Sequence, residues 1–385
     1  MKKRVAALIL GLFFILNALP CAALDINPAT DRDFDVPCQA AILIDEDSGT
    51  VLYEKNADES RPIASITKIM TLLLAFEALE AGKVSLSDIV PVSEHAYHMG
   101  GSQIWLEPGE QLTLDEMLKA ICISSANDAA VAVAEFIGGS EPVFVERMNA
   151  RAAELGMNDT VFKNCNGLDE DGHITSAYDV AVMSRALMQH EKIFDYTLIW
   201  IDYVRDGQTQ LVNTNKLVRT YDGILGLKTG TTSAAGSCIS AAAERNGMRL
   251  IAVVLGAENT KDRFSAASSL LDYGFVNWKL TTPELPELPE LPVTGGMVSA
   301  VSLACEAPRG VLTASGGAEI GIKLILPENV PAPVKPGDVL GTAEVALNGD
   351  TVQSLKITAK TEAPAITFSS ALQYFLACFF AAEAA

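Results

Sequence analysis

The chain has 385 residues, 49% of them hydrophobic, and carries a formal net charge of −20 at pH 7. A chain of this length can bury a large core, and the length suggests two or three domains. Because phosphate binding requires clustered Lys and Arg, the acidic balance argues against nucleic acid as a partner.

The first 23 residues have the pattern of a secretory signal peptide. Residues 2–4 are basic, residues 6–19 are apolar, and small residues follow at 21–23. This pattern predicts cleavage near Ala23 and a mature protein that is exported, either to the outer face of the cytoplasmic membrane or into the medium. A lipid-modified Cys21 is the competing interpretation, and Pro20 disfavours it because such sites require a small residue there.

Six further cysteines are dispersed along the chain without the close spacing of a metal site. The four histidines do not form ligand pairs with them, so neither a metal nor a cofactor is expected. Disulfides can form outside the cell, but small buried thiols are the default for cysteines spread this widely. The six are Cys38, Cys122, Cys165, Cys238, Cys305 and Cys378.

Residues 40–44 and 50–53 are apolar and flank the turn-forming residues 45–49, which predicts a β-hairpin. After it, Ser65 and Lys68 open an apolar run that predicts a helix. Positions i and i+3 share one helix face, so the Lys68 amine can reach the Ser65 hydroxyl. The unpaired N–H groups at a helix start would stabilise an oxyanion there, although a serine and lysine at this spacing also occur on many surface helices.

The middle of the chain is predicted to be helical. Thr113 and Glu116 have the spacing of a capping box, and the helix that they open is expected to stop at residues 124–127. Thr175 or Ser176 can cap a later helix that runs to residue 189. Two more helices are predicted between them, over residues 128–137 and 142–155.

After residue 223 the pattern changes to strands. Apolar segments at 224–230, 236–244 and 249–255 are separated by turns, and Asn246-Gly247 is the strongest short hairpin signal in the chain. An antiparallel sheet is therefore built from both ends of the domain around a helical insert, with a helix over 264–278 packed on it. The fold class is α+β.

Three further segments follow the first domain, which spans residues 24–280. Residues 281–296 repeat Pro-Glu-Leu and predict a stiff, Pro-rich linker. Residues 297–362 alternate in hydropathy between turns and predict a small β-sandwich domain without a catalytic cluster.

The tail, residues 363–385, has an apolar helical stripe within positions 364–382. About 17 residues at roughly 1.5 Å each are too short to span a bilayer, so the tail is expected to be amphipathic and to lie on a membrane surface. The alternative is a terminal helix docked on the protein, and the lack of Lys and Arg in the tail weakens the membrane interpretation. The stripe comprises Phe368, Leu372, Phe375, Leu376, Phe379 and Phe380.

Three short motifs occur in a fixed order, and each has the local context that its chemistry requires. Ser65-x-x-Lys68 lies at a helix start, Ser125-x-Asn127 in a loop between helices, and Lys228-Thr229-Gly230 on an apolar strand. Each motif is weak alone, and the three together are a strong signal.

With these motifs the chain resembles the serine D-Ala-D-Ala carboxypeptidases of the low-molecular-weight penicillin-binding protein group, of peptidase family S11 type. The resemblance covers most of residues 30–280, and the linker, β domain and tail match the usual layout of that group. It implies a β-lactamase/transpeptidase-like first domain. It also implies two kinds of partner, namely peptidoglycan stem peptides ending in D-Ala-D-Ala and β-lactam antibiotics as acylating inhibitors.

The resemblance also assigns roles to the motif residues. Ser65 would attack the carbonyl between two D-alanines to form an acyl-enzyme that water hydrolyses, and Ser125 would relay the proton to the leaving amine. Asn127 would hold the substrate amide. The substrate's carboxylate would be bound near Lys228, Thr229 and Gly230.

Two further site features are expected around the third motif. The backbone N–H groups of Ser65 and Thr231 are the candidate oxyanion hole. Arg263 is a candidate second anchor for the substrate carboxylate, because a guanidinium binds a carboxylate in bidentate fashion. The alternative for Arg263 is a surface arginine at a helix start.

Physical chemistry adds a requirement on Lys68. A serine is a poor nucleophile without a base, and a lysine serves as the proton acceptor only if burial or neighbouring cations lower its pKa. Lys228 is expected to approach Lys68, to be charged, and so to keep Lys68 neutral. His173 is expected to be structural because Lys68 already fills the role of base, and Cys122 and Cys238 are expected to be buried.

Four alternatives share parts of this pattern. A β-lactamase, a transpeptidase or a DD-endopeptidase would use the same acylation chemistry, and D-Ala release compared with antibiotic hydrolysis would separate the first from a carboxypeptidase. From a different class, a non-catalytic wall-binding scaffold would depend on the β domain. An intact set of motif residues argues against the scaffold.

Overall fold

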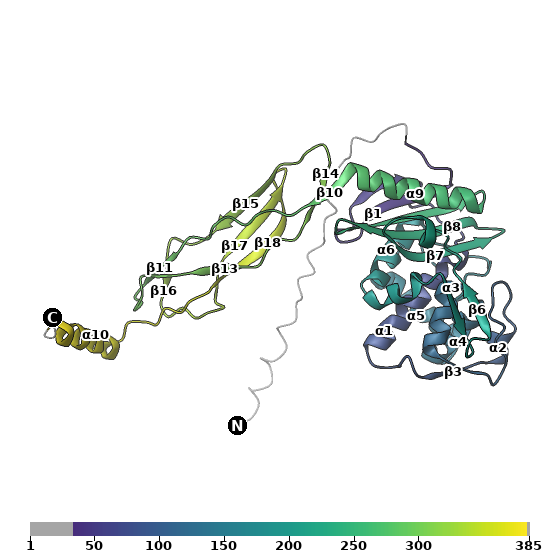
Figure 1. Ribbon diagram of the computed structural model, residues 1–385, viewed down its shortest axis with the longest axis horizontal. Coiled ribbons are helices and arrows are strands. Elements are labelled where there is room, and N and C mark those ends of the chain that lie inside the picture. The colour runs from purple at the N-terminus through teal and green to yellow at the C-terminus, as the bar shows by residue number, and fades with distance from the viewer. Residues whose placement is uncertain (1–33, 383–385) are drawn as a thin grey trace, which may run out of the picture.

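The computed structural model describes residues 34–382, so the expected signal peptide at residues 1–23 lies outside the described residues. Figure 1 shows two parts: an N-terminal module and an elongated β-rich second module, with helix α10 at the far end. The α+β class and the C-terminal β domain predicted from the sequence are confirmed.

A five-stranded antiparallel sheet with strand order β2-β1-β9-β8-β7 is the centre of the N-terminal module. Both ends of the module contribute strands, as the sequence predicts. In this sheet, strand β7 pairs with β8 and forms one edge. The strands are β1 (Ala40–Asp45), β2 (Val51–Lys55), β7 (Ile224–Thr232), β8 (Gly236–Arg245) and β9 (Met248–Ala257).

The turn between β8 and β9 shows how sequence sets this topology. Asn246 and Gly247 have φ angles of 53° and 77°, so both turn residues are left-handed. Such a turn matches the right-handed twist of the flanking strands, and Asn and Gly are the residues that adopt it most readily. The predicted hairpin is confirmed.

Helices cover both faces of the sheet (Figure 1). Helix α9 (Thr260–Asn277) packs on one face through a small apolar cluster that includes Ala267 and Leu270. On the other face, α6 (Ala177–Met188) lies against the sheet and leads into a larger helical core. The sheet is therefore buried between two apolar layers.

The helical insert follows the predicted pattern closely. Helices α4 and α5 lie within one residue of the predicted bounds, and Ser176 caps α6 by accepting a hydrogen bond from the backbone of Asp179. The remaining helical elements are η1 (Ala64–Thr67), α1 (Lys68–Glu80), α2 (Glu94–Tyr97), α3 (Leu114–Ile123), α4 (Asn127–Gly138), α5 (Glu141–Glu154), η2 (Glu191–Ile193), α7 (Phe194–Thr197) and α8 (Leu217–Thr220). Two short strand pairs border the insert: β3 (Ile89–Pro91) with β4 (Gln111–Thr113), and β5 (Ile201–Val204) with β6 (Thr209–Val212).

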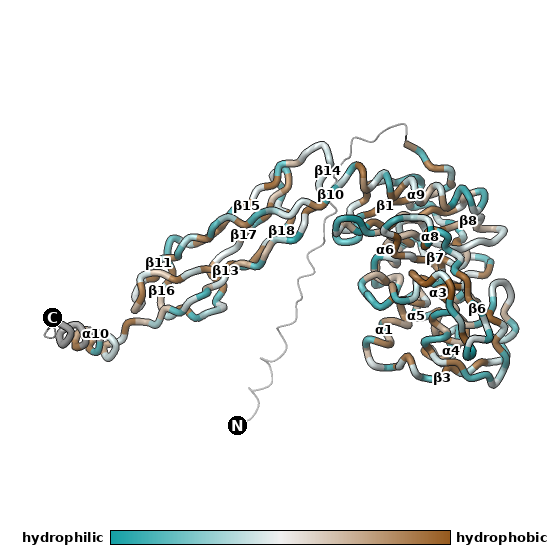
Figure 2. Tube along the Cα trace, in the orientation of Figure 1, coloured by the Kyte–Doolittle hydropathy of each residue, from teal (hydrophilic) through white to brown (hydrophobic). Residues whose placement is uncertain are grey.

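The second module consists of small sheets around its own apolar core. Figure 2 shows hydrophilic and hydrophobic residues mixed along its strands, and β15 alternates in exposure from residue to residue. Its strands are β10 (Trp278–Thr281), β11 (Leu291–Thr294), β12 (Ala300–Val301), β13 (Leu303–Cys305), β14 (Val311–Ala314), β15 (Ile320–Ile325), β16 (Val330–Pro331), β17 (Val339–Leu347) and β18 (Asp350–Ala359).

The segment predicted as a linker differs from that expectation at its C-terminal end. Strand β11 lies inside residues 281–296, pairs with β12 and β16, and buries Leu291 in the core of the second module. Leu291 is the last leucine of the Pro-Glu-Leu repeat, and the periodic prolines obscured its strand character. The second module therefore begins before residue 297.

The two modules are joined by more than a linker. Strand β10 continues directly from α9 and pairs with β14 of the second module. Trp278 and Leu312 share an apolar cluster, and the Ser315 backbone N–H donates to the Asn277 carbonyl at 2.7 Å. These contacts attach the second module to the end of α9.

Helix α10 (Phe368–Ala382) follows the second module, where an amphipathic tail helix is expected. Among its described side chains, Phe368 is 85% exposed, and Leu372, Phe375 and Leu376 are also exposed. Within residues 34–382, no helix is long and apolar enough to cross a bilayer.

The capping box at the N-terminus of α3 is present as predicted, and its contribution to stability can be measured. Thr113 Oγ1 accepts from the Glu116 backbone N–H at 3.3 Å, and Glu116 Oε2 accepts from the Thr113 N–H at 3.0 Å. Because Thr113→Ala leaves a helix-terminal donor unpaired, it is expected to lower the free energy of unfolding by about 1 kcal/mol. Urea denaturation measures this, with Thr113→Ser as the control that keeps the hydroxyl. Equal stability of the two variants would contradict the role of the cap.

Candidate active site

The predicted nucleophile lies on the first turn before a long helix. Ser65 belongs to the 3₁₀ turn η1, and the α-helix itself begins at Lys68. Lys68 Nζ lies 2.9 Å from Ser65 Oγ, so the amine reaches the hydroxyl although the turn is tighter than an α-helix. The serine is half-buried, with its hydroxyl at the boundary between the helical insert and the sheet.

Lys68 is completely buried and has three polar neighbours. Besides Ser65, its amine lies 2.5 Å from Asn127 Oδ1 and 2.6 Å from the backbone carbonyl oxygen of Asn166. A carbonyl oxygen can only accept a hydrogen bond, so these two contacts occupy two N–H groups of the amine. In the neutral amine the third position is a lone pair, and that lone pair faces Ser65 Oγ.

The electrostatics favour this neutral form. Burial lowers the pKa of Lys68 well below its ordinary value of 10.5, and the nearby Lys228 lowers it further. A neutral amine that faces a serine hydroxyl can accept its proton, which is the requirement for a general base.

The role expected for Lys228 needs a correction. Burial also lowers the pKa of Lys228 to about 7, with Arg263 adding to the shift and Cys122 opposing it. The sequence predicts that a charged Lys228 keeps Lys68 neutral. Burial of Lys68 is the larger cause, and Lys228 itself is only partly charged near neutral pH.

Ser125 and Lys228 form a second hydroxyl–amine pair. Lys228 Nζ donates to Ser125 Oγ at 2.8 Å and to the Thr229 carbonyl at 3.0 Å. Ser125 is buried and has a left-handed φ of 63°, which is uncommon for a residue other than glycine. Such strain is found where the surrounding structure holds a functional side chain in place.

Asn127 connects the second motif to Lys68 and to a neighbouring loop. It is the first residue of α4, and its side-chain Nδ2 donates to the Gly100 carbonyl at 2.7 Å. Its backbone N–H donates to the Ser102 carbonyl at 2.7 Å. The side chain therefore orients the Lys68 amine, and its second amide hydrogen is the group left for a substrate.

Strand β7 approaches the nucleophile very closely. A Cβ at Gly230 would lie 2.9 Å from the Ser65 backbone nitrogen, so only glycine permits this contact. Thr231 follows Gly230 on the strand, which places the two candidate oxyanion-hole residues on adjoining segments. Thr229 is buried, and its hydroxyl lies 2.7 Å from that of Thr214.

Arg263 lies behind the same strand. Its side chain is only 5% exposed, and Nη1 donates to the Gly230 carbonyl at 3.1 Å and to Thr231 Oγ1 at 3.0 Å. The interpretation as a surface arginine is therefore wrong. Burial lowers the pKa of Arg263 to about 10, so the guanidinium is charged at neutral pH beside the third motif.

A loop around Asn166 supplies contacts that spacing alone did not predict. The Asn166 carbonyl accepts from Lys68, and a Cβ at Gly167 would lie 2.0 Å from the Ala64 carbonyl oxygen. Gly167 has a φ of 84°, so the close approach and the backbone conformation both require glycine. The Asn-Gly-Leu sequence at residues 166–168 could have indicated this loop. The contact itself could not be predicted, because Lys68 is bound by a backbone carbonyl, which every residue type has.

His173 and the cysteines are packing groups, as expected. The Lys163 N–H donates to His173 Nδ1 at 3.1 Å, so Nε2 carries the proton and donates to Thr67 Oγ1 at 2.7 Å. Burial lowers the pKa of His173 to about 4, which keeps it neutral. Cys122 and Cys238 are buried, and burial raises the pKa of their thiols to about 12 and 11.

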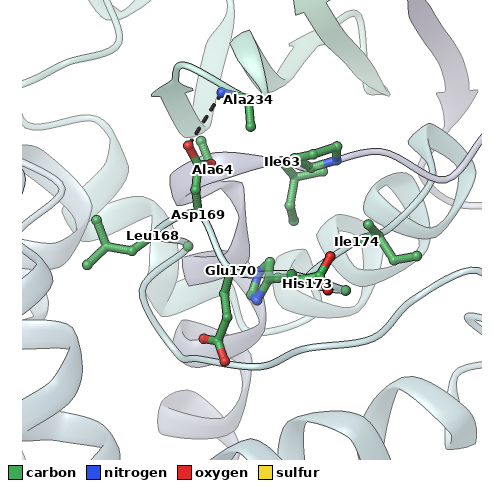
Figure 3. Close-up of a pocket in the computed structure, with 12 residues that line it drawn as sticks. Ile63, Ala64, Leu168, Asp169, Glu170, His173, Ile174 and Ala234 are labelled. Carbon is green, nitrogen blue, oxygen red and sulfur yellow. Dashed lines mark hydrogen bonds between the residues drawn. The ribbon is translucent and has the colours of Figure 1, made fainter.

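A cavity of about 400 Å³ borders the start of η1 (Figure 3). Ile63 and Ala64 line one side, the loop 167–174 another, and Ala234 closes it through an N–H that donates to Asp169 Oδ2 at 3.4 Å. The cavity is mostly apolar with acidic residues at its rim, so it can take a side chain with an apolar stem. In the part of the chain that the structure describes, no cluster of His, Cys, Asp or Glu could hold a metal ion.

Comparisons with known proteins agree with this geometry. Residues 27–259 match the family model of D-alanyl-D-alanine carboxypeptidases, peptidase family S11, and residues 287–365 match the C-terminal domain of penicillin-binding protein 5. The D-alanyl-D-alanine carboxypeptidase DacF of Bacillus subtilis is 40% identical over 370 residues, which cover 94% of this chain and 95% of that protein.

Solved structures give the same result. Penicillin-binding protein 5 from Haemophilus influenzae is similar at a TM-score of 0.71 and 29% identity, covering 86% of this chain and 98% of that one. Penicillin-binding protein 3 from Streptococcus pneumoniae, described as a peptidoglycan synthesis regulatory factor, also has a TM-score of 0.71, with 30% identity over 86% of this chain and all of that one (100%). The chain therefore belongs to peptidase family S11, the D-alanyl-D-alanine carboxypeptidases of the low-molecular-weight penicillin-binding protein group.

Proposed function

We propose that this enzyme removes the C-terminal D-alanine from peptidoglycan pentapeptide stems through an acyl-enzyme on Ser65, and that β-lactams acylate the same serine. The observation that carries the proposal is the set of contacts around the Lys68 amine. Two carbonyl oxygens occupy its N–H groups, and its remaining position faces Ser65 Oγ.

Acylation begins with transfer of the Ser65 hydroxyl proton to Lys68. The Ser65 oxygen then adds to the carbonyl carbon between the two D-alanines, and the backbone N–H groups of Ser65 and Thr231 stabilise the oxyanion. The C–N bond breaks as the departing amine receives, through Ser125, the proton that Lys68 accepted from Ser65, so Lys68 is neutral again; Lys228 holds the Ser125 hydroxyl at 2.8 Å. The products are free D-alanine and an ester on Ser65.

Deacylation reverses the proton path with water in place of the amine. Lys68 accepts a proton from water, the resulting hydroxide adds to the ester carbonyl, and Ser65 leaves with a proton returned from Lys68. The tetrapeptide stem is released with a new carboxylate. The enzyme returns to its starting protonation state without a metal or cofactor taking part in these steps.

Substrate recognition uses the cations beside β7. The terminal carboxylate of the substrate lies near Lys228, Thr229 and Gly230, with Arg263 as a charged group behind the strand. A carboxylate next to Lys228 favours its charged form and therefore raises its pKa from about 7. Binding of the substrate thus charges Lys228, which in turn helps to keep Lys68 neutral.

We also propose that the protein is exported and that α10 lies on a membrane surface. The described side chains of α10 expose a stripe that includes Phe368 and Phe375, and the helix lies at the far end of the second module (Figure 1). Its 15 residues extend roughly 22 Å at about 1.5 Å each, which is shorter than a bilayer core. An interfacial position satisfies both observations.

Ser65→Ala is expected to abolish covalent labelling by penicillin and to lower D-Ala release from a diacyl-D-Ala-D-Ala peptide by at least about a thousandfold, because no acyl-enzyme can form. Fluorescent penicillin on a denaturing gel and a D-alanine assay measure the two effects. Ser87→Ala, at an exposed serine, is the matched control and should behave as wild type. Equal labelling of Ser65→Ala would rule out the assigned nucleophile.

Asn127→Asp tests the protonation state of Lys68. It replaces a neutral oxygen 2.5 Å from the amine with a charged carboxylate, which favours the protonated lysine and should raise its pKa. Acylation needs neutral Lys68, so the rate rises with pH through this pKa, and the rising limb should move to higher pH. The pH profile of penicillin acylation measures the shift.

Asn127→Ala is the matched control for that experiment. It loses the same hydrogen bond to Gly100 but adds no charge, so its rising limb should not move to higher pH. A rising limb that stays in place in Asn127→Asp would show that Lys68 is not the group whose neutral form is required.

A further inference from the structure

Trp105 is an exposed aromatic residue in a strained backbone conformation. It belongs to the loop between α2 and β4, its side chain is 75% exposed, and its φ is 59°. A left-handed φ is a genuine outlier for a bulky residue. The residues on either side, Ile104 and Leu106, are buried, so the loop turns only the indole outward.

A buried polar clamp holds this conformation. Asp128 is fully buried, and its carboxylate accepts from the backbone N–H groups of Ile104 and Leu106 at 3.1 Å each. From the other side, Arg205 donates to the Ile104 carbonyl at 2.7 Å and to the Trp105 carbonyl at 3.1 Å. The backbone is therefore fixed both before and after Trp105.

The outward position of the Trp105 side chain does not itself stabilise the fold. An exposed indole leaves its apolar surface in water, and the left-handed backbone is unfavourable for tryptophan. A single exposed aromatic residue is ordinary on a protein surface, but it does not normally come with strain and a buried carboxylate that maintains it. The combination indicates that the outward indole has a ligand.

The clamp also places Trp105 beside the catalytic motifs. Asp128 directly follows Asn127, and the Asn127 N–H donates to the Ser102 carbonyl in the same loop. Trp105 lies three positions after Ser102, so their Cα atoms are at most about 11 Å apart. Trp105 therefore belongs to the wall that carries Asn127, whereas the carboxylate-binding cations belong to β7 and α9.

We propose that Trp105 is a specificity-determining residue that packs against the stem peptide on the acyl side of the scissile bond. The inference rests on the proposed function, and it takes the second amide hydrogen of Asn127, which is left for a substrate, to hold the amide on the acyl side. Residues that precede D-Ala-D-Ala extend along the Asn127 wall, and the aliphatic part of the adjoining residue is the surface that an indole face would cover. A sugar attached at the start of the stem lies several residues farther away.

The test compares a minimal substrate with a longer one. The variant Trp105→Asn suits the left-handed backbone, so its melting temperature should equal or exceed that of wild type. Its kcat/KM on the free pentapeptide should fall roughly three- to tenfold, mainly through KM, because an aromatic contact of this kind is lost. Its kcat/KM on N-acetyl-D-Ala-D-Ala, which lacks the preceding residues, should be unchanged.

Two control variants accompany it. Trp105→Phe keeps an aromatic face and should recover most of the activity on pentapeptide. Tyr178→Asn removes a different exposed aromatic side chain, on α6, and should leave both substrates unaffected.

Each other outcome overturns the proposal. Equal losses on both substrates would mean a structural role, and no loss on either would mean that Trp105 has no contact with the stem. A loss seen only with disaccharide-pentapeptide would assign the contact to sugar. Penicillin labelling of Ser65 in the wild type reports on the proposed function independently, so its failure is distinguishable from a failure at Trp105.

Discussion

The burial of one amine is the constraint on which the rest of the site depends. A charged lysine without a counter-ion is costly inside a protein, so Lys68 loses its proton instead. Three separate segments then define what the neutral amine can do, because Asn127 and the Asn166 carbonyl occupy its N–H groups and Ser65 faces the lone pair. Removing any one of these contacts would free the amine to turn away from the serine.

The architecture explains why these segments meet. Strand β7 is the edge of the sheet, so its free side can face the helical insert instead of another strand. Gly230 allows that edge to approach the Ser65 backbone, and the same strand carries Lys228 to Ser125. Helix α9 supports the strand from behind through Arg263. The site is thus an interface between two layers, and packing of both layers sets its distances.

Local structure was predictable from the sequence where a few neighbouring residues determine it. The capping box at Thr113 and the Asn246-Gly247 turn are short-range effects, and both are present as predicted. The three motifs were also identifiable, because nucleophile and base are side chains. The role of the Asn166 carbonyl could not be identified from the sequence, since a backbone acceptor is available at every position. The burial of Arg263 could not be identified either, because it depends on tertiary packing. Strand β11 was obscured because its one proline, Pro292, follows the Pro-Glu-Leu repeat of the predicted linker directly.

Two strained residues, one in a catalytic motif and one in the loop beside it, are held by the same kind of contact. Ser125 and Trp105 both adopt left-handed backbones, and buried polar contacts hold the chain at each of them. Such contacts are strong because they are shielded from water, so they can outweigh the backbone strain. A backbone held in this way loses little further freedom when a substrate binds, and more of the contact energy remains available for recognition. The fixed backbone thus positions two side chains with different roles, the proton relay of Ser125 and the proposed stem-peptide contact of Trp105.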